Sequence, residues 1–453
     1  MGHDSIVPST LKTCSTSGRR QLLLRQSYVL SPLHSSAILF AVSPTYSEPI
    51  QMHIVFVHQN FPAQFGHIAD YLSRRKGFRC TFVTNKQQRN GGAIELIRYE
   101  TKGSATQKNH YCSRTFENST WHAHAVYEAL KARPDVRPDL VVGHSGFGST
   151  LFLRELYPEV PIINYFEYFY RPRNSDIDFR PDFPSNELNR LRSMSRNAML
   201  LLDLENCQLG YSPTRWQQSL LPSSFRAKVR VIFDGIDVNL WKPMPGLPRT
   251  IGNVELPAGS EIVTYATRGM ESIRGFDIFM KFAKQLCEQR KEVVILIAGE
   301  DRVCYGGDQT VTGPRSFKEW VLSQDDYDLS RIRFLGLLPP QELAKLFNLT
   351  DLHVYLTVPF VLSWSLMNAL ACGATVLASA TAPVKEMVRH EVNGLLVDFF
   401  DVEGMTELAN RVLDDPAAYR PLGVAAAASI RERYSMDVTL PQMLSLYEEA
   451  VSG

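Results

Sequence analysis

The sequence predicts an α/β fold made of two doubly wound domains, each a parallel sheet covered by helices. Three observations lead to this prediction. The 453 residues suffice for two or three domains at roughly 100–200 residues each. Short β-rich apolar runs alternate with longer amphipathic stretches, as in successive βαβ units. The runs form two series, separated by a stretch with four prolines within 241–259.

Each expected strand is a short apolar run. The first series comprises Ile54–His58, Cys80–Thr84, Leu140–Gly143, Pro161–Tyr165, Leu209–Ser212 and Val229–Phe233. The second comprises Ile262–Ala266, Val293–Ala298, Ile332–Gly336, Leu352–Thr357, Ala374–Ser379 and Leu395–Val397. Between two of these runs, Phe276–Arg290 carries apolar residues at 276, 279, 282, 283 and 286, which is close to helical spacing. In such sheets ligands bind at the carboxyl ends of the strands.

The composition is that of a globular protein, with 44% hydrophobic and 21% charged residues. Lys+Arg 48 against Asp+Glu 47 leaves a net charge of +1, so no overall field attracts the chain to nucleic acid and we expect none as a partner. The seven cysteines are scattered, which argues against a disulfide framework and favours a cytoplasmic location. Apolar runs such as Val293–Ala298 are far shorter than the 18 or so residues of a membrane span.

Four segments follow from these patterns. Residues 1–51 are rich in Ser and Thr and poor in acids, which fits a targeting peptide as well as a disordered tail. Residues 52–245 are expected to form the first domain and 246–430 the second. The last segment, 431–453, is expected to be a helix that packs back on the first domain.

The loop from Ala266 to Phe276 carries the strongest chemical signal. It follows a predicted strand, leads into a predicted helix, and holds Arg268 and Arg274 six residues apart. Two guanidinium groups on one such loop can converge on a diphosphate, which they bind with paired hydrogen bonds. Gly269 and Gly275 would let the backbone come close to a ligand. The alternative is two solvated arginines in an ordinary loop.

The segment from Tyr355 to Gly373 carries a second signal. A strand ends there, and a helix is predicted to begin near Ser363–Ser365 with a serine as its N-cap. The N–H groups and the positive dipole end at such a helix start favour phosphate binding. A capped helix without a ligand fits the segment equally well.

Together these motifs resemble the retaining glycosyltransferases of family GT4. The resemblance rests on the order of Arg268-Gly269, Arg274-Gly275, the strand end Ala298–Arg302, the segment Pro359–Gly373 and Thr381–Glu386. Val231–Asp237 is similar to the interdomain motif of that family, usually Asn-Gly-(Ile/Val)-Asp. The resemblance extends from Met52 to the C-terminus and implies the GT-B fold, in which two Rossmann-like domains face each other across a cleft.

The resemblance implies that a sugar is moved from a nucleotide-diphosphate sugar, with retention, to an unidentified glycan, lipid-linked or small-molecule acceptor. Arg268 and Arg274 would act as catalytic cations, with no metal and no cofactor. The other donor-binding residues it implies are Gly66, Gly269, Glu300, Phe360, Val361, Leu362, Ser363, Trp364, Ser365 and Asn368.

One departure from the family pattern bears on activity. The Glu-x7-Glu motif of the family falls on Phe360 and Asn368, and neither is acidic here. The sequence Pro-Phe-Val-Leu-Ser-Trp-Ser resembles a bacterial subgroup that lacks the first Glu and keeps the second. A neutral amide at 368 would hold ribose hydroxyls more weakly than a carboxylate. A catalytically weak or inactive nucleotide-sugar-binding homologue is therefore the alternative.

The first domain offers fewer candidates. By resemblance His144, after a predicted strand, contacts the transferred sugar, although a lone His at a strand end is more often a structural hydrogen-bonder. The pairs His122/His124 and Asp176/Asp178 are poor candidates for metal binding, because the first lies on a predicted helix and the second in a loop. A run of arginines between 171 and 196 could meet a phosphorylated or lipid-linked acceptor at a membrane surface. It could equally be a solvated helix face.

Overall fold

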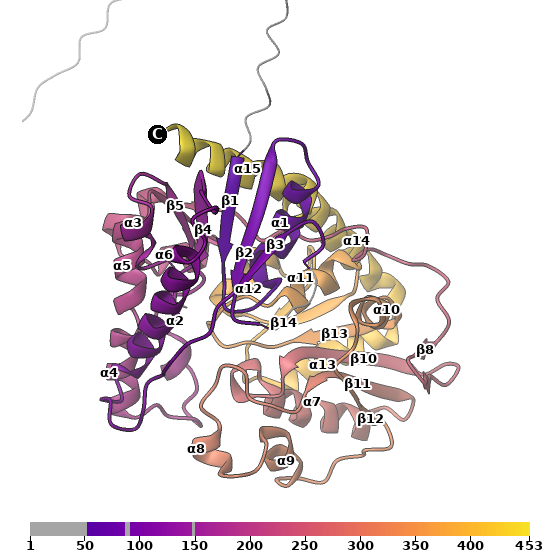
Figure 1. The fold of residues 1–453 in the computed structure, drawn as a ribbon. Coiled ribbons are helices and arrows are strands. Elements are labelled where there is room, and N and C mark those ends of the chain that lie inside the picture. Colours follow the sequence, from indigo (N-terminus) through magenta and orange to yellow (C-terminus); the bar gives the residue numbers. More distant parts are fainter. Residues whose placement is uncertain (1–51, 87–90, 147–149) are drawn as a thin grey trace, which may run out of the picture. The chain divides into compact units, whose positions relative to one another are not determined.

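The structure is a computed structural model and describes residues 52–86, 91–146 and 150–453. The expectation for 1–51 lies outside the described residues. The first sheet has seven strands: β1 Met52–Val57, β2 Phe78–Thr84, β3 Glu95–Arg98, β4 Leu140–His144, β5 Ile162–Tyr165, β6 Leu209–Ser212 and β7 Val229–Val231. Its helices are α1 Gly66–Ser73, α2 Arg114–Lys131, α3 Leu153–Leu156, α4 Glu187–Ser195, α5 Ala198–Asn206 and α6 Arg215–Ser219 (Figure 1).

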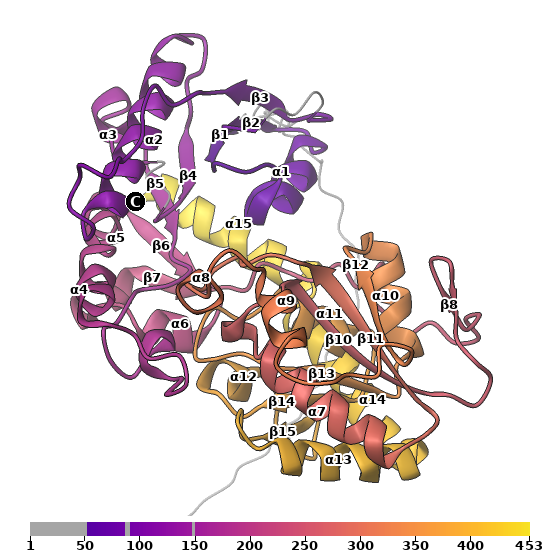
Figure 2. The same cartoon turned by 90° about the horizontal axis from the view of Figure 1, so that it is seen from below.

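The second sheet has six strands: β10 Glu261–Gly269, β11 Val293–Glu300, β12 Ile332–Gly336, β13 Leu352–Tyr355, β14 Val376–Ser379 and β15 Leu395–Val397. Its helices are α7 Phe276–Gln289, α8 Gln309–Thr312, α9 Phe317–Leu322, α10 Pro340–Leu349, α11 Trp364–Ala371, α12 Ala382–Met387 and α13 Val402–Asp414. Two long helices end the chain, α14 Pro416–Arg433 and α15 Met436–Ser452 (Figure 2).

Both sheets are parallel throughout and share one strand order. The first runs β3-β2-β1-β4-β5-β6-β7 and the second β12-β11-β10-β13-β14-β15. In each, the first strand of the series lies inside the sheet, and the order reverses between it and the fourth. This is the order of a doubly wound nucleotide-binding fold, so the predicted pair of Rossmann-like domains is confirmed.

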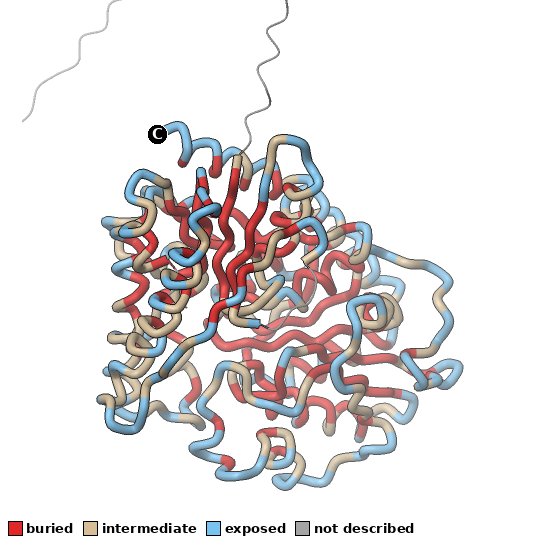
Figure 3. The backbone as a smooth tube through the Cα atoms, in the orientation of Figure 1, coloured by how far each residue is buried: buried red, intermediate tan, exposed pale blue. Residues whose placement is uncertain are grey.

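The strands are apolar on both faces because helices cover both. In β1, Ile54 and Phe56 belong to one hydrophobic cluster, whereas Val55 and Val57 belong to another. The buried residues accordingly run along the strands of both sheets, while exposed residues concentrate on helices and loops (Figure 3). Burying each such side chain stabilises the fold by about 1.5–3 kcal/mol. A continuous apolar run is therefore the expected pattern for these strands.

All twelve predicted strands are present, with ends that differ by at most three residues. The predicted helix over Phe276–Arg290 is α7. The sequence analysis missed β3, a four-residue strand at the sheet edge that has two apolar residues between two charged ones. It also missed a small hairpin between the domains, β8 Thr250–Ile251 and β9 Val254–Glu255. Gly252 turns that hairpin with a φ of 53°, a conformation that favours glycine.

The chain passes between the two sheets twice, and the passages touch. After β7, Ile236 forms a parallel bridge with Ser435, just before α15. Gly235 has a φ of 94°, and a Cβ there would lie 2.5 Å from Thr439 Oγ1 of α15. Along α15 the side chains from Leu440 to Ala450 join the core of the first sheet, beside β4 and β5. Among the helices of the described ranges, none has the length and apolar composition needed to cross a membrane.

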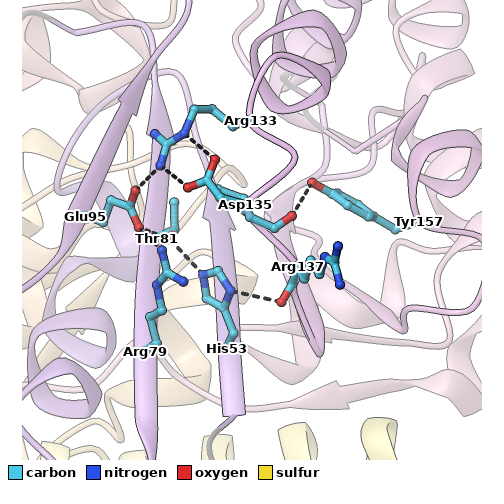
Figure 4. A network of polar contacts seen from close by, with 9 residues as sticks. His53, Arg79, Thr81, Glu95, Arg133, Asp135, Arg137 and Tyr157 are labelled. Atoms are coloured by element: carbon cyan, nitrogen blue, oxygen red, sulfur yellow. Dashed lines mark hydrogen bonds and ion pairs between the residues drawn. The ribbon is translucent and has the colours of Figure 1, made fainter.

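A network of charges ties the amino ends of the first three strands (Figure 4). Glu95 of β3 receives hydrogen bonds from Arg133 (2.6 Å) and from Arg79 of β2 (2.8 Å). It also accepts from the Thr81 hydroxyl (3.1 Å), whose oxygen lies 2.8 Å from His53 Nε2 of β1. Each cation in this group has a carboxylate partner, so the network is a structural clamp. It lies at the end of the sheet opposite to the one where ligands bind in this fold.

Candidate active site

The two points where strand order reverses bring candidate residues together. Ligands bind to doubly wound sheets at these points, outside the carboxyl ends of the strands. In the first sheet, His58 follows β1 and His144 ends β4, and their rings lie 5.0 Å apart. In the second sheet, Arg268 lies near the end of β10, and Thr357 follows β13. The strand order thus selects the positions that the motifs indicated.

Arg274 is buried at the second of these points. It ends a 3-10 turn, and Gly275 then reverses the chain with a φ of 65°. Its Nη1 donates to Thr357 Oγ1 (2.9 Å), the Val361 carbonyl oxygen (3.1 Å) and the Tyr355 hydroxyl (3.3 Å). Arg274 is 5% exposed, and among the described residues it forms no ion pair. A buried cation bound only by neutral acceptors favours the arrival of an anion.

Arg268 and Tyr305 complete this positive site. Arg268 is exposed, and its Nη1 donates to the Tyr305 hydroxyl at 3.2 Å. The Tyr305 ring centre lies 5.9 Å from the Arg268 guanidinium and 5.6 Å from that of Arg274. One aromatic side chain thus contacts both cations. The two predicted diphosphate ligands are therefore neighbours in the structure.

The loop that carries Tyr305 is held by the buried carboxylate of Glu271. Glu271 Oε2 accepts the backbone N–H groups of Cys304 (2.9 Å), Tyr305 (2.8 Å) and Gly306 (3.0 Å). Burial raises the pKa of Glu271, and these hydrogen bonds oppose that rise. A Cβ on Gly269 would lie 2.4 Å from the Arg302 carbonyl oxygen. Gly269 is therefore needed for the close approach of this loop to β10.

A cavity of about 420 Å³ lies beside this loop, at the carboxyl ends of β11 and β12. Its lining includes Glu300, Arg302, Lys318 and Phe334. Glu300 ends β11 and forms an ion pair with Arg302 at 2.6 Å. The carboxyl end of a parallel strand is where this fold binds the nucleoside part of a ligand. Glu300, predicted to bind the donor, thus lines a concave site at the end of β11, the strand that pairs with β10.

Helix α11 begins as predicted. Its N-cap is Ser363, whose hydroxyl oxygen accepts the N–H of Ser365 at 3.2 Å. The Phe360 ring packs 4.8 Å from that of Tyr168 and lies 5.8 Å from the Arg274 guanidinium. Leu362 is 6% exposed and belongs to the core of the second sheet. Phe360 and Val361 therefore surround Arg274, whereas Leu362 has a packing role.

Two predicted residues of α11 differ in their surroundings. Trp364 donates its indole N–H to Asp234 Oδ2 at 2.8 Å, so it links α11 to the segment that follows β7. Asn368 is 8% exposed, and its side-chain amide has no hydrogen bond with any residue of the described ranges. Burial raises the pKa of Asp234 to about 7, and the Trp364 hydrogen bond opposes that rise.

In the first domain, His144 is 2% exposed and its Nδ1 lies 2.7 Å from the Ser145 carbonyl oxygen. Burial lowers its pKa to about 4, so the ring is neutral at pH 7. Gly66 begins α1, and a Cβ there would lie 2.1 Å from the Cβ of Pro62. Gly66 is therefore required by packing within its own domain.

Glu167 joins the sites of the two domains. It follows β5, and its Oε1 accepts from Gln64 Nε2 at 3.2 Å. Its Oε2 lies 3.7 Å from His144 Nε2, and its side chain is 29% exposed. Burial raises the pKa of Glu167, while the positive charges of Arg274 and Arg268 act in the opposite direction. The carboxyl group therefore lies within the field of both arginines.

Several other sequence candidates have structural partners. Asp176 accepts from the Tyr168 hydroxyl (2.7 Å), and Asp178 accepts from the backbone N–H groups of 174 and 175. His122 Nδ1 lies 3.0 Å from the Tyr99 hydroxyl. Within the predicted basic run, Arg196 donates to the Tyr170 hydroxyl (2.6 Å). These side chains are used to hold loops and helices in place.

Two family models match this chain on either side of the proline-rich stretch. Residues 76–241 match the model described as Glycosyl transferase family 4 group, and residues 250–428 match that of Glycosyl transferases group 1. The chain belongs to these glycosyltransferases. The predicted family is confirmed.

Proteins with a similar sequence or a similar structure support the same family assignment. One relative, D-inositol 3-phosphate glycosyltransferase of Thermobispora bispora, is 25% identical over 231 residues, which are 49% of this chain and 51% of the relative. The chain spans about half the length of the curated relatives it matches. Sucrose-phosphate synthase from Thermosynechococcus elongatus has a similar structure, with a TM-score of 0.67 at 18% identity, covering 88% of this chain and 99% of that one. HepE of Anabaena, in complex with UDP-glucose, gives 0.60 at 17% identity, covering 89% of this chain and 100% of that one. These two likenesses identify the fold as GT-B.

Three residues of the candidate site were not predicted from the sequence. Glu167 lies two residues beyond a predicted strand, which is the position where this fold places ligand contacts, so that position was the available signal. Tyr305 follows β11 by five residues in a loop without a motif. Gln64 lies in the turn before α1, within the segment His58–Gly66 that fits the N-terminal domain of the family, but no role was predicted for it.

Proposed function

We propose that this protein transfers a sugar from a nucleotide-diphosphate sugar to a hydroxyl group of an acceptor, with retention of the anomeric configuration. Arg268 and Arg274 bind the diphosphate, and the nucleoside enters the cavity lined by Glu300. The observation that carries the proposal is Arg274, a buried cation that has no ion-pair partner in the described chain and lies where its family binds the donor. The relatives named above support the same class of donor.

The reaction follows from the charges at the site. The bond between the anomeric carbon and the diphosphate oxygen breaks, and the two arginines stabilise the negative charge that develops on the leaving group. The acceptor oxygen attacks from the same side and forms the new glycosidic bond. Its proton passes to the leaving diphosphate. This course needs neither a metal ion nor a cofactor, since fixed cations supply the positive charge.

A binding screen tests this function. UDP, GDP and ADP, each with a matching nucleotide sugar, are compared for thermal stabilisation, because a ligand that binds only the folded protein raises its stability. We expect one nucleotide to stabilise the protein and its sugar nucleotide to be cleaved. Product analysis by NMR then reports the anomeric configuration. An inverted product would refute retention, and the absence of binding by every nucleotide would refute the donor site.

Asn368 supports a second candidate, a nucleotide-sugar-binding protein of low or no activity. Its amide lies in the middle of α11 without a hydrogen bond to the described residues, where the family pattern has a carboxylate. Asn368→Glu separates the two functions. If the natural site is impaired, the variant gains donor affinity and cleavage, whereas efficient sugar transfer by the natural protein removes this candidate.

A lipid-linked acceptor and a membrane contact are part of the proposal, together with a cytoplasmic location. Large apolar side chains on α4 and α5 support the contact, since Leu188, Leu191 and Met194 are 43%, 50% and 58% exposed, and Leu201 and Leu202 are each 41% exposed. Such a stripe can enter the interface of a bilayer. Co-sedimentation with phosphatidylglycerol vesicles tests it. Leu191→Glu with Met194→Glu should release the protein, and equal sedimentation of both proteins would refute the contact.

A further inference from the structure

We propose that Glu167, together with Gln64, forms a subsite that hydrogen-bonds a hydroxyl group of the transferred sugar. The inference rests on the proposed function and deepens it, because it assigns a sugar contact to the first domain. Neither residue is among the donor-binding residues that the family resemblance implies. The subsite combines side chains from two separate segments, the turn before α1 and the stretch after β5.

The backbone around Glu167 is held in place by contacts with distant residues. Gln217 Nε2 donates to the backbone carbonyl oxygen of Glu167. Next to it, the Tyr168 hydroxyl donates to Asp176 (2.7 Å) and lies 3.3 Å from the Pro359 carbonyl oxygen of the second domain. The Tyr168 ring also packs on Phe360 at 4.8 Å. Glu167 is therefore held at the contact between the two domains, next to the loop that surrounds Arg274.

The carboxyl group of Glu167 is accessible and incompletely paired. One oxygen accepts from Gln64, and the other lies 3.7 Å from His144 Nε2, beyond a normal hydrogen bond. The imidazole is neutral at pH 7, so this contact is no ion pair. With 29% of the side chain exposed, the group can accept further hydrogen bonds. A carboxylate is the acceptor that binds sugar hydroxyls most strongly.

Among the described residues of the second domain, Glu271 is coupled electrostatically to Arg274, but it is fully buried and its Oε2 already accepts three backbone N–H groups. The segment that wraps this arginine contacts it through the Phe360 ring and the Val361 carbonyl oxygen, neither of which is a carboxylate. Arg274 and Arg268 act on Glu167 electrostatically without forming an ion pair with it. A sugar joined to a diphosphate at the two arginines therefore lies between these cations and the Glu167 carboxyl group.

The test compares the sugar nucleotide with its own nucleoside diphosphate. Pairs of UDP with UDP-glucose, GDP with GDP-mannose and ADP with ADP-glucose are titrated by calorimetry into the natural protein and into Glu167→Gln. For the pair that binds, we expect the variant to lose about 10-fold or more in affinity for the sugar nucleotide, the size of a charged hydrogen bond. Affinity for the diphosphate alone should stay equal or rise, because a negative charge near the arginines is removed.

Two controls keep the result specific. Glu159→Gln makes the same chemical change at an exposed residue before β5 and should alter neither affinity. Thermal midpoints verify that both variants fold. A donor that lacks the contacted hydroxyl should bind the natural protein and Glu167→Gln equally, as a double-mutant cycle requires.

The possible outcomes separate a failure of the sugar subsite from a failure of the proposed function. Equal losses for the diphosphate and for the sugar nucleotide, or no loss for either, would overturn the sugar subsite while the diphosphate site stands. If no pair binds the natural protein, the proposed function fails and the subsite fails with it. A loss confined to the sugar nucleotide supports both.

Discussion

Arg180 and Arg274 are two buried arginines with opposite surroundings. Arg180 is 3% exposed and donates through two nitrogens to Asp277 at 2.8 and 2.6 Å, with Asp182 as a second carboxylate partner. Burial acts to lower the pKa of Arg180, but these hydrogen bonds outweigh it and the pKa is raised. Arg274 is 5% exposed and has only neutral acceptors.

The difference separates a structural cation from a binding one. Arg180 joins the segment after β5 to α7 and needs no further partner. Its arrangement is like that of the clamp around Glu95 at the opposite end of the first sheet (Figure 4). Arg274 keeps its charge because arginine does not lose its proton in proteins, and so its charge is left for a ligand. Asp234 is the acidic counterpart, bound by neutral groups, and its pKa rises to about 7 instead.

The largest expected effect is on stability. Arg180→Ala leaves Asp277 without its cation inside the protein, which costs about 3–5 kcal/mol for a buried pair. We expect a large fall in the free energy of unfolding, measured by urea denaturation. Arg411→Ala, at an exposed position of α13, is the control and should be neutral. A loss below about 1 kcal/mol for Arg180→Ala would end the distinction drawn between the two arginines.

Arg274→Ala should act on binding instead. Loss of a charged hydrogen bond to the diphosphate costs about 1.5–3 kcal/mol, which is roughly a 10- to 150-fold loss of nucleoside diphosphate affinity. The free energy of unfolding should change little, since the lost hydrogen bonds are offset by removal of a buried charge. Calorimetry and denaturation measure the two effects, and Arg274→Lys should lie between. Unchanged affinity would refute the donor-site assignment.

Asp234 allows a test by pH. Its pKa in the folded protein is about 7, against roughly 3.9 in an unfolded chain. Between these values the folded state holds a proton that the unfolded state releases, so stability falls as pH rises from about 4 to 7. Asp234→Asn removes this dependence, and its stability relative to the natural protein should rise by roughly 2 kcal/mol from pH 5 to pH 8. Thermal midpoints across that range measure it, and a pH-independent difference would contradict the buried charge.

Arg268→Ala should have a smaller effect than Arg274→Ala. Arg268 is exposed, so its attraction for the diphosphate is weakened by solvent and screened by salt. We expect an affinity loss of a few fold at low salt. At 0.5 M NaCl the change in binding free energy should fall to about one third of its low-salt value. Titrations at two salt concentrations test this. A loss larger than that of Arg274→Ala would reverse the assigned order of the two cations.

The smallest expected effect is that of metal removal. Because two arginines carry the positive charge at the diphosphate, EDTA should leave nucleotide affinity and sugar transfer unchanged. The measurement is made on protein treated with EDTA and then supplied with Mg²⁺ or Mn²⁺. Loss of activity that either ion restores would contradict a metal-independent reaction.

The fold was largely readable from local patterns. β1 was predictable because a strand buried on both faces is a continuous apolar run. α7 was predictable because a helix buried along one stripe has apolar residues at helical spacing. β3 left no such mark, since an edge strand of four residues buries little. Ser363 as the N-cap of α11 was predictable for a similar reason, because capping depends on the residue itself and its immediate neighbours.

The candidate site was readable only in part. Arg268 and Arg274 lie on one loop, so their cooperation shows in the sequence. Glu167 acts with residues about 100 positions away on either side, Gln64 and Arg274, and no local pattern records such a distance. The same limit applies to Trp364, whose partner Asp234 is 130 positions earlier.

Local sequence patterns were enough to predict the two parallel-sheet domains, the positions of the strands and of α11, and the family that the motifs resemble. Those features depend on the periodic burial and capping of neighbouring residues. The packing of distant segments was needed to show that Arg180 has carboxylate partners whereas Arg274 has only neutral acceptors, and that Glu167 is coupled electrostatically to both cations of the other domain. Charge compensation is set by which side chains meet in space, and the order of residues along the chain does not specify it.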